Sequence, residues 1–361
     1  MIIMKVAFIA RSTLYTAPGG DTVQVEQTAR GLAELGVDAE IVLSNQAISY
    51  DDYDLLHFFN IIRPADILYH SKKANKPFVV STILVNYEEY DQNHRNVPGS
   101  LFSYLSGDSI EYVKTMARWV LGRDHLASLD YTWKGQRKSI MEILGKVNMI
   151  LPNSESEYRR IQQKYHSEVK YAVVPNGIDP ALFKNNPEIK KDEHLVLCVA
   201  RIEGIKNQLN LIRALNNTGF SLLIIGTHAP NQADYHRQCL EIAAGNITFI
   251  EHLPQEELVP YYLKAKVHVL PSWFETTGLS SIEAAVMGCN IVITDKGDTR
   301  EYFENDAFYC DPSSPQSILE AVEKASEAPK DEKLRQKILN QYTWKHTAIQ
   351  TLKAYQLTAI T

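Results

Sequence analysis

Short hydrophobic runs recur along the chain, and polar stretches that read as helices and loops separate them. The runs in the first half cover residues 5–10, 37–43, 53–59, 78–85 and 149–151. Those in the second half cover residues 195–199, 221–225, 247–250, 267–270 and 290–294. Short apolar runs of this kind are typical of buried strands. Their alternation with helices predicts an α/β fold with parallel strands.

The runs form two series, and the stretch between the series predicts a domain boundary. Tyr171–Pro180 reads as a strand that continues into a turn, and the polar stretch Lys184–Asp192 follows it. A chain of 361 residues is also long for a single hydrophobic core. We therefore expect two Rossmann-like domains, residues 1–172 and residues 173–341, that face each other across a cleft.

Composition and charge are those of an ordinary globular protein in a reducing compartment. Hydrophobic residues make up 45% and charged residues 22%, and the formal net charge of -6 argues against a nucleic-acid partner. The four cysteines lie far apart without a C-x-x-C pair, which argues against a cysteine-based zinc site, and Cys198 and Cys289 are expected to be buried thiols. Residues 1–10 read as a strand and not as a signal peptide, and no apolar run reaches the roughly 18 residues that span a membrane. We expect a cytoplasmic location.

The stretch Pro271–Gly288 contains the sharpest candidate chemistry. Its acids Glu275 and Glu283 are separated by seven residues, and Gly278 lies between them, just before a helix expected over residues 279–287. A helix start preceded by a glycine is suited to a phosphate, and carboxylates accept hydrogen bonds strongly from sugar hydroxyls. The stretch follows a strand, and ligands of open α/β sheets bind at the carboxyl ends of strands.

Structural roles would also explain the two acids. Ser280-Ser-Ile-Glu283 fits a capping box, in which Glu283 would cap its own helix. Glu275 would then be an ordinary solvated acid of the loop. The combination of both acids with the glycine and the helix start favours a ligand site over these separate explanations.

The first strand of each series leads into a second group of candidates. Arg201 and Lys206 lie in the loop after residues 195–199, where a guanidinium fork and an ammonium charge could bind a diphosphate, although loop cations are usually solvated. Gly19 and Gly20 follow the first strand, and either a close backbone approach to a phosphate or a plain turn would explain them. The G-x-G-x-x-G dinucleotide fingerprint is absent.

Residues 112–146 form a less regular part of the first half that is rich in aromatic and basic residues. Trp119 and Trp133 lie in it. Its basic residues, Lys114, Arg118, Arg123, Lys134, Arg137, Lys138 and Lys146, outnumber its acids. A basic aromatic helix could contact anionic headgroups at the inner face of a membrane. A helical insertion with a solvated charged face would explain the same pattern.

Taken together, these stretches resemble the retaining glycosyltransferases of family 4, which have the GT-B architecture. The most specific match is Pro271-Ser-Trp-Phe-Glu275 with the E-x7-E spacing to Glu283. The others are Gly19-Gly20, Val174–Asp179, Ala200–Lys206, Ala284, Gly288, Gly297 and the closing segment that begins at Tyr342-Thr-Trp344. The resemblance covers nearly the whole chain and implies that a last helix, about residues 342–361, returns to the first domain.

The resemblance implies a nucleotide-diphospho-sugar donor, UDP- or GDP-linked, and a glycan or lipid-linked acceptor. Arg201 and Lys206 would bind the diphosphate, Glu283 the ribose hydroxyls, and Glu275 would lie beside the sugar. The backbone of Thr276, Thr277, Gly278 and Leu279 would contact sugar and phosphate, and Gly19 and Gly20 would approach the phosphate from the first domain. Glu275, Arg201 and Lys206 are thus the catalytic candidates, with no cofactor and no metal ion.

Two departures from the family pattern leave alternatives open. Leu84 stands where many members have a functional histidine, and Thr276-Thr277 replaces a frequent Gly-Phe pair. His57, His94 and His125 have no spacing that promotes any of them to that role, so no acid–base residue is assigned. A sugar-nucleotide epimerase or phosphorylase, or a non-catalytic nucleotide-sugar-binding subunit, would use the same scaffold.

Overall fold

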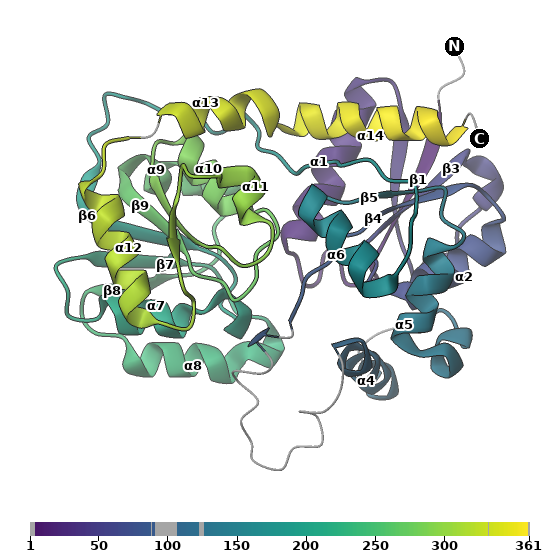
Figure 1. Ribbon diagram of the computed structural model, residues 1–361, viewed down its shortest axis with the longest axis horizontal. Helices are drawn as coiled ribbons and strands as arrows, with labels where there is room; N and C mark the ends of the chain where they lie inside the picture. The colour runs from purple at the N-terminus through teal and green to yellow at the C-terminus, as the bar shows by residue number, and fades with distance from the viewer. Residues whose placement is uncertain (1–3, 88, 91–106, 123–125, 331, 360–361) are drawn as a thin grey trace. The chain divides into compact units, whose positions relative to one another are not determined.

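The computed structural model describes residues 4–87, 89–90, 107–122, 126–330 and 332–359. Contacts divide the chain into two compact units. Unit 1 comprises residues 1–88, 92–176 and 344–361, and unit 2 comprises residues 89–91 and 177–343. Each unit contains one parallel sheet with helices packed on it (Figure 1). The expected α/β class with two Rossmann-like domains is therefore confirmed.

The sheet of unit 1 has the strand order β2-β1-β3-β4-β5, and all its pairings are parallel. Its strands are β1 (Lys5–Ala10), β2 (Asp38–Leu43), β3 (Leu55–Phe59), β4 (Phe78–Ser81) and β5 (Met149–Leu151). Every residue of β3, β4 and β5 is buried, as the continuous apolar runs require of strands with helices on both faces.

Unit 1 also contains helices, most of which pack on the two faces of this sheet. They are α1 (Gly20–Glu34), α2 (Pro64–Ala74), α4 (Gly107–Val120), α5 (Asp130–Leu144), α6 (Glu155–Tyr165), α14 (Trp344–Ala359) and the short η1 (Tyr50–Asp52). On one face, residues of α2, α5 and α6 share a buried cluster with the strands. On the other, Ala348 and Tyr355 of α14 lie in one core with Val25 and Leu32 of α1. The expected return of the last helix to the first domain is confirmed.

The strand expected over residues 78–85 is shorter in the structure. Strand β4 ends at Ser81, because Ile83 adopts a left-handed backbone conformation with φ of 46°. A β-branched residue rarely adopts this conformation. The buried carboxylate of Glu157 holds it from both sides, since one oxygen accepts hydrogen bonds from the Thr82 hydroxyl (2.5 Å) and the Leu84 amide (2.7 Å).

The sheet of unit 2 has the strand order β11-β10-β9-β6-β7-β8 and is also parallel. Its strands are β6 (Asp192–Val199), β7 (Ser221–Ile225), β8 (Ile247–Ile250), β9 (Ala265–Leu270), β10 (Asn290–Thr294) and β11 (Phe308–Cys310). The chain builds outward from β6 to β8, then returns to pair β9 with the opposite edge of β6. This reversal is the topological switch point of the sheet, where doubly wound α/β proteins bind ligands.

Helices pack on both faces of this second sheet as well. They are α7 (Gln208–Leu215), α8 (Ala233–Ile242), α9 (Gln255–Lys264), α10 (Leu279–Val286), α11 (Thr299–Phe303), α12 (Pro315–Glu327), α13 (Glu332–Gln341), η3 (Gly204–Lys206) and η4 (Pro230–Gln232). Residues of α9, α10 and α13 share the buried cluster on one face, and residues of α7, α8 and α12 share the cluster on the other. All four cysteines are buried and free, as expected for Cys198 and Cys289.

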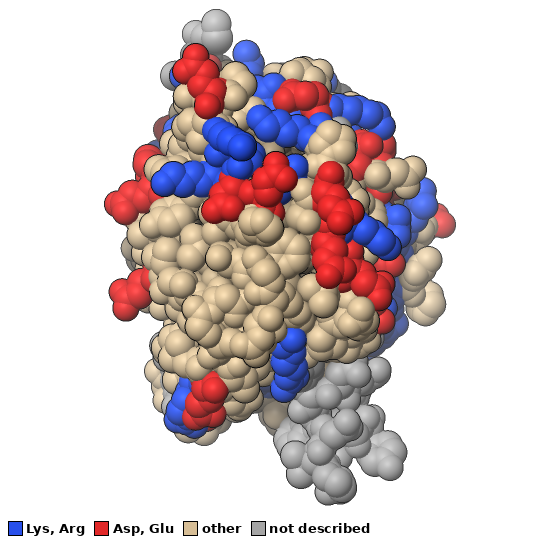
Figure 2. All heavy atoms as spheres, turned by 90° about the vertical axis from the view of Figure 1, so that its left-hand side faces the viewer, with Lys and Arg blue, Asp and Glu red and all other residues tan. Residues whose placement is uncertain are grey.

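The surface carries charges of both signs. Figure 2 shows the face that lies on the left in Figure 1, where acidic and basic side chains are interspersed around a broad area that has neither.

Within residues 112–146, which are rich in basic and aromatic side chains, Trp133 is 91% exposed and Leu129 is 68% exposed. Among the residues that the structure describes, no helix is both long and apolar enough to cross a membrane.

Candidate functional site

The candidate residues of unit 2 meet at the switch point between β6 and β9. The loop after β6 carries Arg201 and Lys206, and the loop after β9 carries Glu275 and Gly278. Because β6 and β9 are parallel neighbours, both loops leave the same edge of the sheet. The structure thus brings together residues that lie about 70 positions apart in sequence.

Lys206 and Glu275 form an ion pair at the centre of this edge. The Lys206 Nζ lies 2.6 Å from the Glu275 Oε2, and the two side chains are 21% and 9% exposed. The hydroxyl of Ser272 donates a second hydrogen bond, of 3.1 Å, to the same oxygen. Glu275 is therefore a held, nearly buried carboxylate, and the alternative of a solvated loop acid is wrong.

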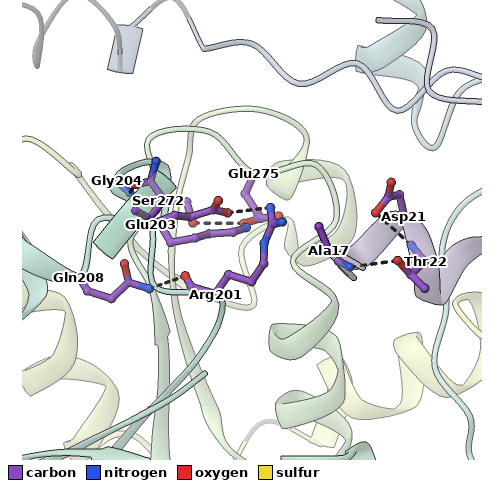
Figure 3. A network of polar contacts seen from close by, with 12 residues as sticks. Ala17, Asp21, Thr22, Arg201, Glu203, Gly204, Gln208, Ser272 and Glu275 are labelled. Carbon is purple, nitrogen blue, oxygen red and sulfur yellow. Dashed lines mark hydrogen bonds and ion pairs between the residues drawn. The ribbon is translucent and has the colours of Figure 1, made fainter. Parts of the chain in front are cut away.

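Arg201 lies in the same loop and is more exposed than Lys206. Its side chain is 43% exposed, and its Nη2 donates to the Oε1 of Glu203 at 2.9 Å. The side-chain amide of Gln208 donates to the Arg201 carbonyl at 2.9 Å, which ties the loop to the start of α7 (Figure 3). A guanidinium that is partly exposed and has one carboxylate partner still has donors available for an anion.

Asn207 joins the loops at this edge. It has a left-handed backbone with φ of 62°, and its side-chain amide donates to the carbonyls of Pro271 (3.0 Å) and Pro312 (2.7 Å). The Trp273 amide donates to the Ile205 carbonyl at 2.8 Å. The loops after β6, β9 and β11 are thus linked by hydrogen bonds. Sequence reasoning missed Asn207, although an asparagine just before a helix is a recognisable local signal.

Glycine at position 297 allows the backbone of Glu275 to pass close by. The Glu275 amide donates to the Lys296 carbonyl (3.2 Å), and the Asp298 amide donates to the Glu275 carbonyl (2.9 Å). A Cβ atom at position 297 would lie 2.1 Å from the Glu275 carbonyl oxygen, and φ is 94° there. Only glycine satisfies both conditions.

Gly278 ends the loop and begins α10. It is the N-cap residue with φ of 69°, and the amides of Ser281 and Ile282 donate to its carbonyl. Thr277 is buried, and its hydroxyl lies 3.2 Å from that of Tyr302, whereas Thr276 and Leu279 are half-buried. A Cβ atom added at Gly278 would lie 3.5 Å from the Glu275 Cγ, so the first turn of α10 begins beside Glu275.

Glu283 does not cap its own helix, so the capping-box alternative is wrong. The helix begins two residues earlier than that box requires, with Gly278 and not Ser280 as N-cap and with no side-chain cap. The Glu283 carboxylate instead accepts hydrogen bonds from the Gln255 amide (2.8 Å) and the Tyr262 hydroxyl (2.9 Å). Burial raises the pKa of Glu283 to about 7. Sequence reasoning missed both partners, which lie on α9 and share no motif with Glu283.

The glycine loop of unit 1 is organised by an arginine that sequence reasoning also missed. Gly19 is the N-cap of α1, and its amide donates to the Thr22 hydroxyl at 3.0 Å. Arg11 donates to both carboxylate oxygens of Asp21, at 2.6 and 2.9 Å. The assignment of Gly19 and Gly20 to a phosphate stays a prediction.

Of the three histidines considered for an acid–base role in the first domain, the structure describes His57. His57 is fully buried between the hydroxyls of Tyr355 (2.6 Å) and Ser81 (2.8 Å), and burial lowers its pKa to about 3. It is a neutral structural histidine. Leu84 is 5% exposed. His94 and His125 lie outside the described residues.

Comparison with known proteins agrees with this geometry. Residues 181–343 match the family model described as glycosyl transferases group 1. This segment makes up nearly all of unit 2 and contains every site residue discussed for that unit. The expected resemblance is confirmed at the level of this group: unit 2 matches the family model of glycosyl transferases group 1, and the chain has the GT-B fold.

Individual relatives align over nearly the whole chain. An uncharacterised glycosyltransferase of Methanocaldococcus jannaschii is 22% identical and aligns over 98% of this chain and 98% of its own length. D-inositol 3-phosphate glycosyltransferase of Stackebrandtia nassauensis is 25% identical, over 96% of this chain and 90% of its own. Among solved structures, sucrose-phosphate synthase from Thermosynechococcus elongatus has a TM-score of 0.77 at 17% identity, covering 99% of this chain and 100% of that chain.

Proposed function

We propose that this protein is a retaining, metal-independent glycosyltransferase. It moves a sugar from a UDP- or GDP-linked donor to a glycan, glycolipid or other acceptor. The observation that carries the proposal is the Lys206–Glu275 ion pair at the switch point, with the start of α10 beside it. A carboxylate, a cation and a helix start in one place fit a sugar joined to a diphosphate.

Each group of the site has a role in this proposal. The diphosphate binds Lys206 and Arg201 at the start of α10, and the ribose hydroxyls bind Glu283. Glu275 lies beside the sugar ring, and the backbone of Thr276, Thr277 and Leu279 surrounds the sugar and phosphate. Similarity supports the donor class: HepE of Anabaena, whose structures include complexes with UDP and with UDP-glucose, has TM-scores of 0.64 to 0.71 to this chain at 14 to 15% identity.

The proposed chemistry breaks the bond between the anomeric carbon and the diphosphate oxygen. Positive charge develops on the sugar ring and negative charge on the leaving diphosphate, so Glu275 stabilises the first and Lys206 and Arg201 the second. These cations and the helix start supply the stabilisation that a metal ion would otherwise provide. The acceptor hydroxyl attacks from the same face, and the leaving phosphate oxygen takes its proton, so no histidine at position 84 is required.

Two alternatives predict different products. A sugar-nucleotide epimerase would convert the donor alone, and a phosphorylase would transfer the sugar to added inorganic phosphate in place of an acceptor hydroxyl. A non-catalytic subunit would bind donor and release no nucleotide with any acceptor. Product analysis with and without acceptor therefore separates the three functions.

The deciding experiment measures nucleotide release from a panel of sugar nucleotides, with candidate acceptors and in the presence of EDTA. We expect one donor to give nucleotide and a glycosylated product of retained anomeric configuration. Glu275→Ala and Lys206→Ala should each lose about 100-fold or more in kcat. Full activity of both variants would refute the site, and activity that needs added magnesium would refute metal independence.

A further inference from the structure

The carboxylate of Glu283 is held by two donors from a single neighbouring helix. Gln255 and Tyr262 both lie on α9, seven positions apart, which places them on one face two turns from each other. Gln255 donates to one Glu283 oxygen at 2.8 Å, and Tyr262 donates to the other at 2.9 Å. Glu283 is 6% exposed, and the two hydrogen bonds fix the orientation of its carboxylate group.

Tyr262 is itself fixed at its other end. The residue is fully buried, and its backbone carbonyl accepts hydrogen bonds from the Lys191 ammonium (2.7 Å) and the Cys289 thiol (3.1 Å). The side chain therefore spans from this buried polar group to Glu283. A rigid tyrosine donor loses little freedom when it binds, which suits a residue that orients another one.

We propose that Tyr262 and Gln255 are positioning residues that orient the Glu283 carboxylate for the vicinal hydroxyls of the donor's ribose. A carboxylate has about four acceptor positions, of which α9 occupies one on each oxygen. One position on each oxygen is left, and two adjacent hydroxyls match two adjacent oxygens. This inference rests on the proposed function, because it assigns the ribose to Glu283.

The pH dependence of nucleotide affinity offers a way to measure this arrangement, because it depends on the pKa of Glu283. Burial raises the pKa of Glu283 to about 7, while the hydrogen bonds from Tyr262 and Gln255 hold that pKa down. Other charged or titratable groups nearby are His268 of β9, which burial keeps neutral by lowering its pKa to about 3, and Lys191 with Cys289 beyond Tyr262. Arg335 of α13 donates to the Val286 carbonyl at the far end of α10. A hydroxyl pair binds the ionised carboxylate more strongly, so nucleotide affinity should rise with pH.

The test measures binding of UDP and GDP by calorimetry from about pH 5.5 to pH 9, for the wild type and for Tyr262→Phe. We expect wild-type affinity to fall roughly tenfold per pH unit below its midpoint. Loss of the phenol donor should move that midpoint upward by about one unit, so that Tyr262→Phe binds weakly near pH 6.5 and recovers near pH 9. The 2′,3′-dideoxy nucleotides should show neither the pH dependence nor the shift.

Three comparisons make the outcome decisive. Gln255→Met, a substitution of similar size on a half-buried residue, should shift the midpoint in the same direction and decides the question if Tyr262→Phe does not fold. Tyr355→Phe, which removes another fully buried phenol in unit 1, should leave the midpoint unchanged. An equal loss of affinity at every pH in both α9 variants would overturn the positioning role. If the wild type binds neither UDP nor GDP, the proposed function itself fails.

Discussion

The ammonium nitrogen of Lys206 and a carboxylate oxygen of Glu275 lie 2.6 Å apart across 69 positions of sequence. The contact exists because β6 and β9 are neighbours at the switch point of the second sheet. Both side chains are mostly withdrawn from water, so each charge depends on the other for compensation. Stability and the proposed catalysis therefore depend on the same pair, but in different ways.

We predict that a double-mutant cycle separates the effect of this ion pair on stability from its effect on activity. Lys206→Met alone should lower the free energy of unfolding by about 1–3 kcal/mol, because it leaves Glu275 unpaired and nearly buried. Adding Glu275→Gln should recover most of this loss, yet the double variant should remain inactive. Urea unfolding gives the energies, and Arg237→Met, at a largely exposed pair with Asp234, should cost less than about 0.5 kcal/mol. Equal destabilisation in the single and double variants would contradict the coupling.

A second prediction concerns the close approach at Gly297. Gly297→Ala should lower the free energy of unfolding by roughly 2 kcal/mol or more, because the new Cβ would lie 2.1 Å from the Glu275 carbonyl at a φ of 94°. Nucleotide affinity should fall with it, since the loop that carries Glu275 must move. Gly219→Ala is the matched control, as no heavy atom lies within 4 Å of its added Cβ. Unchanged unfolding in Gly297→Ala would show that the loop accommodates the side chain.

A third prediction follows from the raised pKa of Glu283. Folding favours the neutral carboxyl, because its pKa is about 7 in the fold against an ordinary value of 4.5. The resulting stabilisation is complete below pH 4.5 and is lost as the pH rises through about 7, by roughly 3 kcal/mol in total. Glu283→Gln, neutral at every pH, should therefore unfold at higher urea than the wild type near pH 8.

The same substitution should give no such advantage near pH 5, where the wild-type carboxyl is mostly protonated. Glu323→Gln on the exposed side of α12 controls for the change of charge alone. Parallel stability curves for Glu283→Gln and the wild type across this range would refute the raised pKa. The free energy of unfolding should fall as the pH rises, whereas the affinity for the donor should rise. The difference arises because the ribose hydroxyls of the donor hydrogen-bond the ionised Glu283 carboxylate.

Much of this site could be predicted from the local pattern, because strand ends and loop residues are local properties. Strand bounds such as Lys5–Ala10 and Asn290–Thr294 agree with the structure, and so does the position of Glu275 in a loop, whereas Lys206 ends the short η3. The pairing of β6 with β9 is not local, since it depends on where the chain reverses. The alternating pattern predicts only that both loops lie at the carboxyl edge of one sheet, and the contact between Lys206 and Glu275 was not predicted.

Other features had no readable signal in one sequence. The partners of Glu283 are a glutamine and a tyrosine on another helix, and residues of these types are common on any amphipathic helix. The left-handed Ile83 contradicts its own β-propensity, because the tertiary contacts of Glu157 outweigh local preference. Both features depend on side chains that meet only in the fold.

The last prediction tests the two interpretations of residues 112–146. Trp133 is 91% exposed and Leu129 is 68% exposed, and Arg137 and Lys138 are exposed further along α5, beyond the break in that helix at Gly135. Such a surface gains free energy at an interface that offers both apolar and anionic groups. We expect the protein to sediment with vesicles containing anionic phospholipid at low salt, and Trp133→Ser to weaken this binding by roughly tenfold.

Two controls separate a membrane contact from nonspecific adsorption. Leu240→Ser changes another exposed apolar residue, 49% exposed on α8 of unit 2, and should leave vesicle binding unchanged. Vesicles of neutral phospholipid should bind less, because the basic residues then lack anionic partners. Equal binding of Trp133→Ser and the wild type would favour the other interpretation, in which α5 belongs to a helical insertion and its charged side chains are simply solvated.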